Sequence, residues 1–152
     1  VYRYPLGEKA RADLERAFER LTEGAEAGPT SLSVKGRTIA VPLAARGVAR
    51  FSFAELCEKP LGARDYLAIA THFHTVVLDG VPKLSTDKRN EARRFMTLVD
   101  ALYEHRVKLI VAADAPPDQL YPKGDGAFEF QRTVSRLMEM QSKDYLNLEH
   151  LT

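Results

Sequence analysis

Residues 73–113 read FHTVVLDGVPKLSTDKRNEARRFMTLVDALYEHRVKLIVAA, and this stretch decides the fold. Two apolar runs, Thr75–Leu78 and Lys108–Ala112, flank a long amphipathic segment. Strands that are buried on both faces lose the alternation of apolar and polar residues, which is typical of parallel sheets whose strands are joined by helices. We therefore predict a βαβ unit, in which a helix connects two parallel strands.

The middle segment has the pattern of a long helix. Charged residues fill the positions between the apolar ones, which recur at helical spacing: Ala92, Phe95, Met96, Val99, Leu102 and Tyr103. Its start is expected near Ser85, Thr86 and Asp87, whose side-chain oxygens can accept hydrogen bonds from the first free N–H groups of a helix. The rest of the chain is expected to pack on this unit.

The composition is that of an ordinary globular domain. The chain has 152 residues, of which 45% are hydrophobic and 28% charged, and this is enough for one domain with a core. A net charge of +1 gives no overall field that favours nucleic acid or an anionic membrane. No apolar run is long enough for a membrane span, and no basic-then-apolar leader is present. The chain begins at Val1 and not at methionine, which indicates a processed protein or a fragment of a longer one.

Upstream of the crossover we expect a helix, a loop, a hairpin and a short strand. The helix begins after Gly7, and glycines and a proline indicate a loop over residues 24–29. A hairpin is predicted from two alternating runs, Ser31–Val34 and Arg37–Val41, because a two-residue turn with glycine separates them. The next elements are a strand over residues 48–53, a helical turn in which Ser52 and Glu55 match the capping box, and a helix over residues 64–73.

Downstream, a helical turn that carries Leu120 and Tyr121 leads into a glycine-containing loop over residues 122–126. A last long helix is expected from Phe128 to about Ser142. Its inward residues are predicted to be Phe130, Val134, Leu137, Met138 and Gln141. The predicted fold class is α/β: a small domain with the βαβ unit in a central, partly parallel sheet, flanking helices and an N-terminal β-hairpin.

Several kinds of catalytic site are not expected. No GxxxxGK[ST] phosphate loop is present, so the chain is not expected to hydrolyse ATP independently. The histidines, including His72 and His74, have no second ligand pair at metal-binding spacing, so no metal site is predicted. There is no GxSxG elbow, and the apolar setting of Cys57 predicts a small buried side chain. No catalytic residue is predicted, and a free-standing small enzyme is the least favoured function.

Two kinds of charged residue remain as candidates. Asp79 and Asp114 follow the two buried strands, where open α/β sheets bind ligands, although capping of the following turn is the favoured role for each. Arg132 and Arg136 lie four residues apart on one helix, where like charges repel unless an anion lies between them. They either form salt bridges with Glu129 and Glu139, or present two phosphate-seeking guanidinium groups to a nucleotide on a neighbour or to an acidic partner. Arg93 and Arg94 on the crossover helix allow the same two interpretations.

Several blocks of sequence resemble the C-terminal portion of the ZapE family, which are AAA+-type ATPases of bacteria and mitochondria. In chain order the blocks are FSFAELC at 51–57, PLGARDYL at 60–67, RNEARRF at 89–95, Leu120-Tyr121, and FEFQRTVSRLMEMQS at 128–142. The resemblance implies that residues 1–152 form a single C-terminal domain of a larger ATPase. The phosphate loop and the acidic metal-binding strand of the family lie upstream, so ATP and Mg²⁺ are expected for the full-length protein and no cofactor for this chain.

The resemblance also implies a role. The domain would pack on the upstream ATPase domain, support ATP hydrolysis in a homo-oligomer, and present Arg132 or Arg136 in trans to a bound nucleotide. The alternative is a client-binding module, in which Arg93, Arg94 and Tyr121 recognise a partner, because the family acts in cell division and in turnover of mitochondrial membrane-protein subunits. The expected location is the bacterial cytoplasm, or alternatively the mitochondrial matrix.

Overall fold

The computed structural model describes all residues from Val1 to Thr152. The strands are β1 (Tyr2–Arg3), β2 (Gly28–Val34), β3 (Arg37–Ala45), β4 (Val48–Ser52), β5 (Thr75–Val81) and β6 (Lys108–Ala113). The α-helices are α1 (Glu8–Leu21), α2 (Phe53–Cys57), α3 (Ala63–His72), α4 (Arg89–Glu104), α5 (Ala127–Glu139) and α6 (Lys143–Leu146). Two short 3₁₀ turns, η1 (Thr86–Lys88) and η2 (Pro117–Gln119), precede α4 and α5.

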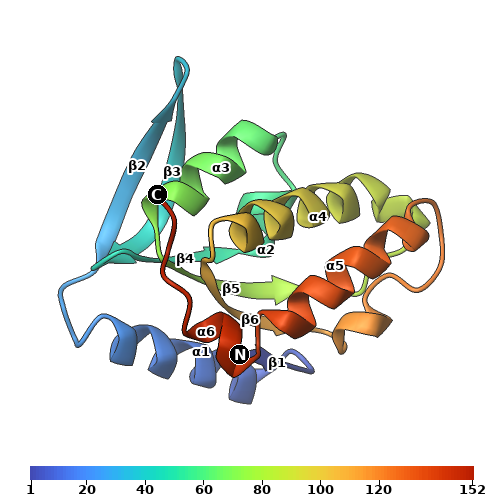
Figure 1. The fold of residues 1–152 in the computed structure, drawn as a ribbon, viewed down its shortest axis with the longest axis horizontal. Helices are drawn as coiled ribbons and strands as arrows, with labels where there is room; N and C mark the ends of the chain where they lie inside the picture. The colour runs from blue at the N-terminus through green and yellow to red at the C-terminus, as the bar shows by residue number, and fades with distance from the viewer.

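All six strands form one sheet in the order β1-β6-β5-β4-β3-β2 (Figure 1). β5 and β6 are parallel neighbours, with Val76 opposite Leu109, and α4 connects them. The predicted βαβ unit is therefore confirmed. β4 and β1 extend the parallel part, whereas β2 and β3 form the antiparallel hairpin. The α/β class and the partly parallel sheet are confirmed as well.

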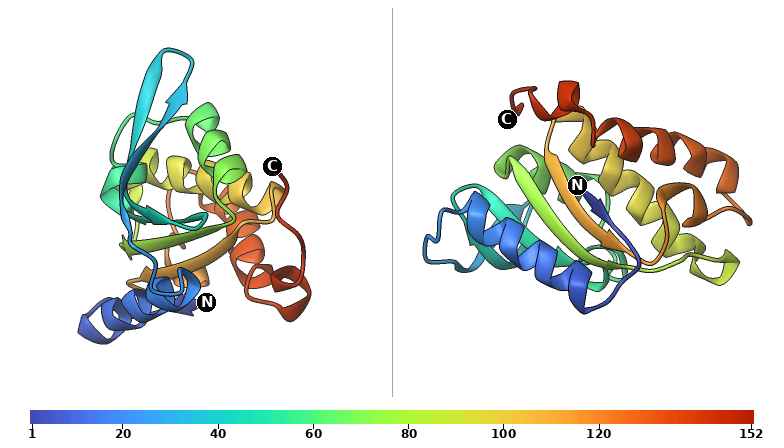
Figure 2. Two further views of the ribbon diagram at one scale, coloured as in Figure 1. Left: turned by 90° about the vertical axis from the view of Figure 1, so that its left-hand side faces the viewer. Right: turned by 90° about the horizontal axis from the view of Figure 1, so that it is seen from below.

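Helices cover both faces of the sheet, so that the central strands are buried on each side (Figures 1 and 2). On one face α1 packs Leu14 and Phe18 against Val48, Val77 and Ile110. The larger core lies on the other face, between the sheet and α2 to α5. Burial of each large apolar side chain there contributes about 1.5–3 kcal/mol, which explains why the strands of the crossover contain hardly any polar residue.

The predicted two-residue turn of the hairpin and the predicted capping box of α2 are both confirmed. Lys35 and Gly36 both have positive φ, 40° and 79°, which is the backbone that a two-residue hairpin turn with the right twist requires. Ser52 and Glu55 form the predicted capping box, since each side chain accepts a hydrogen bond from the backbone N–H of the other residue, at 2.7 and 3.2 Å. Cys57 is fully buried, and burial raises the pKa of its thiol to about 12.

Three boundaries differ from the expectation. β2 begins at Gly28, inside the predicted loop, because Gly28 pairs with Ala44 across a bulge that the local composition does not indicate. α5 ends at Glu139, since Ser142 caps the separate helix α6 by accepting a hydrogen bond from the N–H of Tyr145. None of the proposed caps of α4 acts as one, because Ser85 donates instead to Asp87 and the segment forms η1.

The inner face of α5 also differs from the expectation. Phe130 and Leu137 are buried as expected, but Thr133 takes the buried place between them. Met138 is 57% exposed and Gln141 is exposed. No helix of the protein has both the length and the apolar character that crossing a membrane requires.

Candidate functional site

The two arginines of α5 meet two acidic residues of α4. Arg132 donates to Asp100 with 2.8 Å between Nη2 and Oδ2, and Arg136 donates to the other carboxylate oxygen of Asp100. Arg136 also lies 3.6 Å from Glu104. The spacing explains the geometry, because Asp100 and Glu104 are one turn apart on α4 and the arginines are one turn apart on α5. We call these four residues the α4–α5 charge cluster.

Arg136 is the more firmly held of the two arginines. Its guanidinium carbon lies 4.7 Å from the centroid of the Tyr103 ring, at a cation–π distance, and its side chain is only 20% exposed. Tyr103 donates in turn to Glu139, at 2.9 Å, and this hydrogen bond raises the pKa of Tyr103. Arg136 thus joins the two helices and has little freedom to reach a ligand.

Arg132 is held at one point and is otherwise free. Its side chain is 67% exposed, and Asp100 is its one partner in the protein. The remaining N–H groups of its guanidinium point to solvent, where they can donate to a carboxylate or a phosphate. A salt bridge this exposed contributes about 1 kcal/mol or less, so an anion can compete for the side chain.

The salt-bridge interpretation of the arginines is correct in kind, although the partners differ from those expected. Glu129 forms no salt bridge with either arginine, and Glu139 is the acceptor of Tyr103. Sequence reasoning missed Asp100 because it considered only partners on the same helix. The signal was present, since Asp100 and Glu104 repeat on α4 the four-residue spacing of the arginines on α5.

The predicted partner-binding residues lie in two separate parts of the fold. Arg93 and Arg94 line a hollow of about 330 Å³ between α3 and α4, and Arg94 also donates to the backbone oxygen of Cys57 at 3.1 Å. Tyr121 is only 2% exposed; its ring packs on Phe130 and its hydroxyl holds the backbone of Asp125. A partner at this end would therefore meet the loop that Tyr121 supports rather than the tyrosine itself.

The ends of the parallel strands offer little to a nucleotide. Asp79 lies opposite Ser52 at the carboxyl end of β5, and its carboxylate is 3.9 Å from Arg11. Asp114 is exposed after β6, and its N–H bonds to the oxygen of Val81. The residues of this edge do not fit a triphosphate with its metal, because one carboxylate already has a cationic partner and no glycine-rich loop supplies a row of N–H donors.

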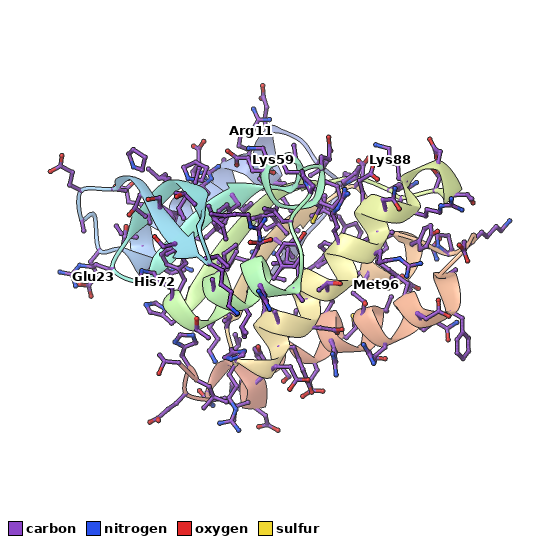
Figure 3. The ribbon with its side chains drawn as sticks, turned by 90° about the horizontal axis from the view of Figure 1, so that it is seen from above. Arg11, Glu23, Lys59, His72, Lys88 and Met96 are labelled. Atoms are coloured by element: carbon purple, nitrogen blue, oxygen red, sulfur yellow. The ribbon has the colours of Figure 1, made fainter.

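The histidines do not come together. His72 ends α3 beside the hairpin (Figure 3), and it lines a hollow together with Ser31 and Ser33 of β2. His74 lies before β5 and contacts Thr75 and the backbone of Arg46. Nowhere in the chain do three or more His, Cys, Asp and Glu side chains form a group that could hold a metal ion.

Comparison with known proteins gives one consistent family. The AFG1-like ATPase family matches residues 1–149. The cell division protein ZapE of Escherichia coli K12 is 40% identical over 151 residues, which cover 97% of this chain and 39% of that protein. Lactation elevated protein 1 homolog B of Danio rerio is 38% identical over 149 residues, which cover 77% of this chain and 30% of that protein.

An uncharacterized protein of Schizosaccharomyces pombe is 33% identical over 144 residues, which cover 76% of this chain and 32% of that protein. The chain thus spans about two fifths, or less, of the length of these relatives. No solved structure matches it.

Proposed function

Because this chain belongs to the AFG1-like ATPase family and is a relative of ZapE, we propose that it forms the C-terminal domain of a larger ATPase. In this role it supports ATP hydrolysis by the full-length protein and does not bind ATP alone. ATP and Mg²⁺ are held by the upstream part, in a homo-oligomer. The proposed location is the bacterial cytoplasm, with the mitochondrial matrix as the alternative.

The exposed guanidinium of Arg132, on a helix that is fixed to the core, supports this role. An arginine that acts on a neighbour's phosphate must reach outward and yet stay in a defined place, because its benefit depends on position. α5 meets the second condition through Phe130 and Leu137, and Asp100 limits the freedom of the Arg132 side chain. Arg136 contributes by holding α5 against α4.

The first test is a calorimetric titration of this chain with ATP and Mg²⁺. We expect no heat of binding up to millimolar nucleotide, since the carboxyl edge of the sheet has no phosphate loop and Asp79 is paired with Arg11. A dissociation constant in the micromolar range would contradict the proposal. The full-length protein serves as the positive control.

A client-binding module is the second candidate, and the hollow between α3 and α4 favours it. Arg93, Arg94 and Asn90 line this hollow together with the polar side chain of Thr97. Arg93 is exposed and has no acidic partner, in contrast to the arginines of α5. An acidic segment of a division protein or of a membrane-protein subunit would suit this surface.

Charge reversal at single positions separates the two functions. In the full-length protein, Arg132→Glu is expected to abolish most ATP turnover and to leave binding of a glutamate-rich probe peptide unchanged, because the two surfaces are separate. Arg93→Glu is the matched variant, with the opposite outcome expected if the client-binding module is correct. Normal turnover in Arg132→Glu, together with lost peptide binding in Arg93→Glu, would replace the first function by the second.

A further inference from the structure

The hollow between α3 and α4 brings two arginines together without an acidic partner. The two helices lie side by side (Figure 1), and Arg93 and Arg94 both line the hollow between them, which measures about 330 Å³. Neither guanidinium forms a salt bridge within the chain. Arg94 is partly buried, as Arg50 and Arg136 are, and those two each have a carboxylate beside them. Arg94 therefore lacks the anion that stabilises a cation removed from water.

The side of the hollow that α4 forms offers N–H donors. Nη1 of Arg94 donates to the backbone oxygen of Cys57 at 3.1 Å, which holds the side chain in place and leaves its other N–H groups without a partner in the protein. Arg93 is exposed, and Asn90, about one turn before it, lines the same hollow. The hydroxyl of Thr97 donates to the backbone oxygen of Arg93 at 3.0 Å. Because no carboxylate lines the hollow, these donors favour an anionic ligand.

The opposite side of the hollow is apolar. Leu61, which precedes α3, and Ala63, in the first turn of α3, line it next to the arginines. Leu61 is partly buried and Ala63 is exposed, so both can contact a ligand. Tyr66 also belongs to the lining, but it is fully buried and its hydroxyl donates to the backbone oxygen of Leu56 at 2.7 Å. A ligand that fits both sides carries an anion and an apolar group close to each other.

The last residue of a polypeptide has this composition. Its α-carboxylate presents two oxygens that match the planar fork of a guanidinium, and an apolar side chain leaves the same Cα atom. Ligand pockets measure about 300–1,000 Å³, so a hollow of about 330 Å³ is at the small end and suits one residue. An internal acidic segment would carry its apolar group on a neighbouring residue, and its chain would have to enter and leave the hollow. Capture of a C-terminal carboxylate is a recurring mode of peptide recognition.

We propose that this hollow binds the C-terminal residue of a client polypeptide whose last side chain is apolar. Arg93 and Arg94 pair with the α-carboxylate, and Leu61 and Ala63 contact the last side chain. This inference rests on the client-binding candidate of the proposed function, and it narrows the acidic segment of that candidate to the end of a chain. It does not depend on a contact between Arg132 and a nucleotide.

The test measures binding of dye-labelled peptides to the full-length protein by fluorescence anisotropy. The peptide GSGSAL with a free C-terminus is expected to bind, and its C-terminal amide about tenfold more weakly, because the amide removes the charge that pairs with the arginines. Serine in place of the last leucine is expected to weaken binding about tenfold as well, since the apolar contact is lost. The amide of GSGELG carries an acidic and an apolar side chain inside the peptide and should bind as weakly as the amide of GSGSAL.

A matched pair of variants assigns the binding to this hollow. Arg93→Gln is expected to weaken binding of the free peptide about tenfold and to leave binding of its amide unchanged, because only the free peptide has the carboxylate. Arg20→Gln is the control and should change neither affinity. Arg20 is also exposed and without a salt bridge, and it lies in the last turn of α1, on the other face of the sheet.

Equal affinities of the free peptide and its amide would overturn the inference, as would the absence of binding or an unchanged affinity in Arg93→Gln. Equal binding of the GSGELG amide would assign the hollow to an internal acidic segment instead. Binding by this chain but not by the full-length protein would mean that the rest of the polypeptide covers the hollow. An affinity that falls as the protein concentration rises would mean that a second copy covers it. If a glutamate-rich peptide needs Arg93 while the free peptide and its amide bind equally, the client-binding candidate stands and this inference alone fails.

Discussion

Phe95→Ala is expected to lower the free energy of unfolding of this chain by about 4 kcal/mol. Phe95 lies on α4 and is fully buried, with ring centroids 6.1 Å from Phe53 of α2 and 6.2 Å from Phe130 of α5. The substitution removes the apolar transfer energy of the ring, leaves a cavity between three helices and breaks both aromatic pairs. Since a domain of this kind is stable by about 5–15 kcal/mol, most of the margin would be lost.

Urea unfolding followed by circular dichroism measures this loss. Phe128→Ala is the matched control, because it removes the same ring from an 80% exposed position and should change the unfolding free energy by about 0.5 kcal/mol or less. If Phe95→Ala does not fold, Phe95→Leu provides a graded loss of about 1.5 kcal/mol. A loss below about 1 kcal/mol for Phe95→Ala would show that these helices repack easily around the site.

Packing at Phe95 also bears on function, because it determines where the arginines of α5 lie. Phe95 and Asp100 are five residues apart on α4, and both contact α5, through Phe130 and through Arg132 and Arg136. Met96, the residue after Phe95 on α4 (Figure 3), is partly buried and packs against the main core. A change at Phe95 would move α5 relative to α4 and alter the reach of Arg132 without touching its charge. If the proposed function is correct, we expect ATP turnover in the full-length protein to fall when this buried contact is changed.

The parts of the fold that could be predicted from sequence are those that a single element signals by itself. The strands around Val77 and Ile110 must be buried on both faces, and a continuous apolar run is the direct consequence. Ser52 and Glu55 carry their capping box within four residues, and Lys35-Gly36 carries its hairpin turn within two. In each case the cause of the structure is local, so the sequence displays it.

The features that escaped prediction depend on two elements that are far apart in the chain. Gly28 joins β2 because Ala44 is there to pair with it. Met138 faces solvent and Thr133 faces the core because α4, and not the periodicity of α5 alone, decides which side of α5 is covered. Asp100 holds Arg132 across 32 residues of sequence. A pattern read along one helix cannot show which helix will lie next to it.

A contact of the same long-range kind joins the hairpin to α3, and it should show an unusual asymmetry. Asp65 lies in the first turn of α3, and its side chain is only 1% exposed. Its Oδ1 atom accepts a hydrogen bond of 2.5 Å from Nη2 of Arg37, at the start of β3. Its Oδ2 atom accepts a hydrogen bond of 2.7 Å from the N–H of Gly62. Arg37 is 55% exposed. Removal of the exposed partner is therefore expected to cost more than neutralisation of the buried one.

Arg37→Met leaves a buried carboxylate with the Gly62 N–H as its remaining partner, and the expected loss of unfolding free energy is about 3 kcal/mol. Asp65→Asn keeps an oxygen for the Gly62 N–H and releases Arg37 to water, so the expected loss is about 1 kcal/mol. In Arg37→Met with Asp65→Asn no buried charge remains, and the double variant should be more stable than Arg37→Met alone. Arg64 is an exposed arginine in the same helical turn and has no acidic partner, so Arg64→Met is the control and should hardly change the unfolding free energy.

Chemical denaturation of the four variants measures these losses and completes the double-mutant cycle. Equal losses for the two single variants, or strict additivity in the double variant, would show that the Arg37–Asp65 contact does not hold the hairpin against α3.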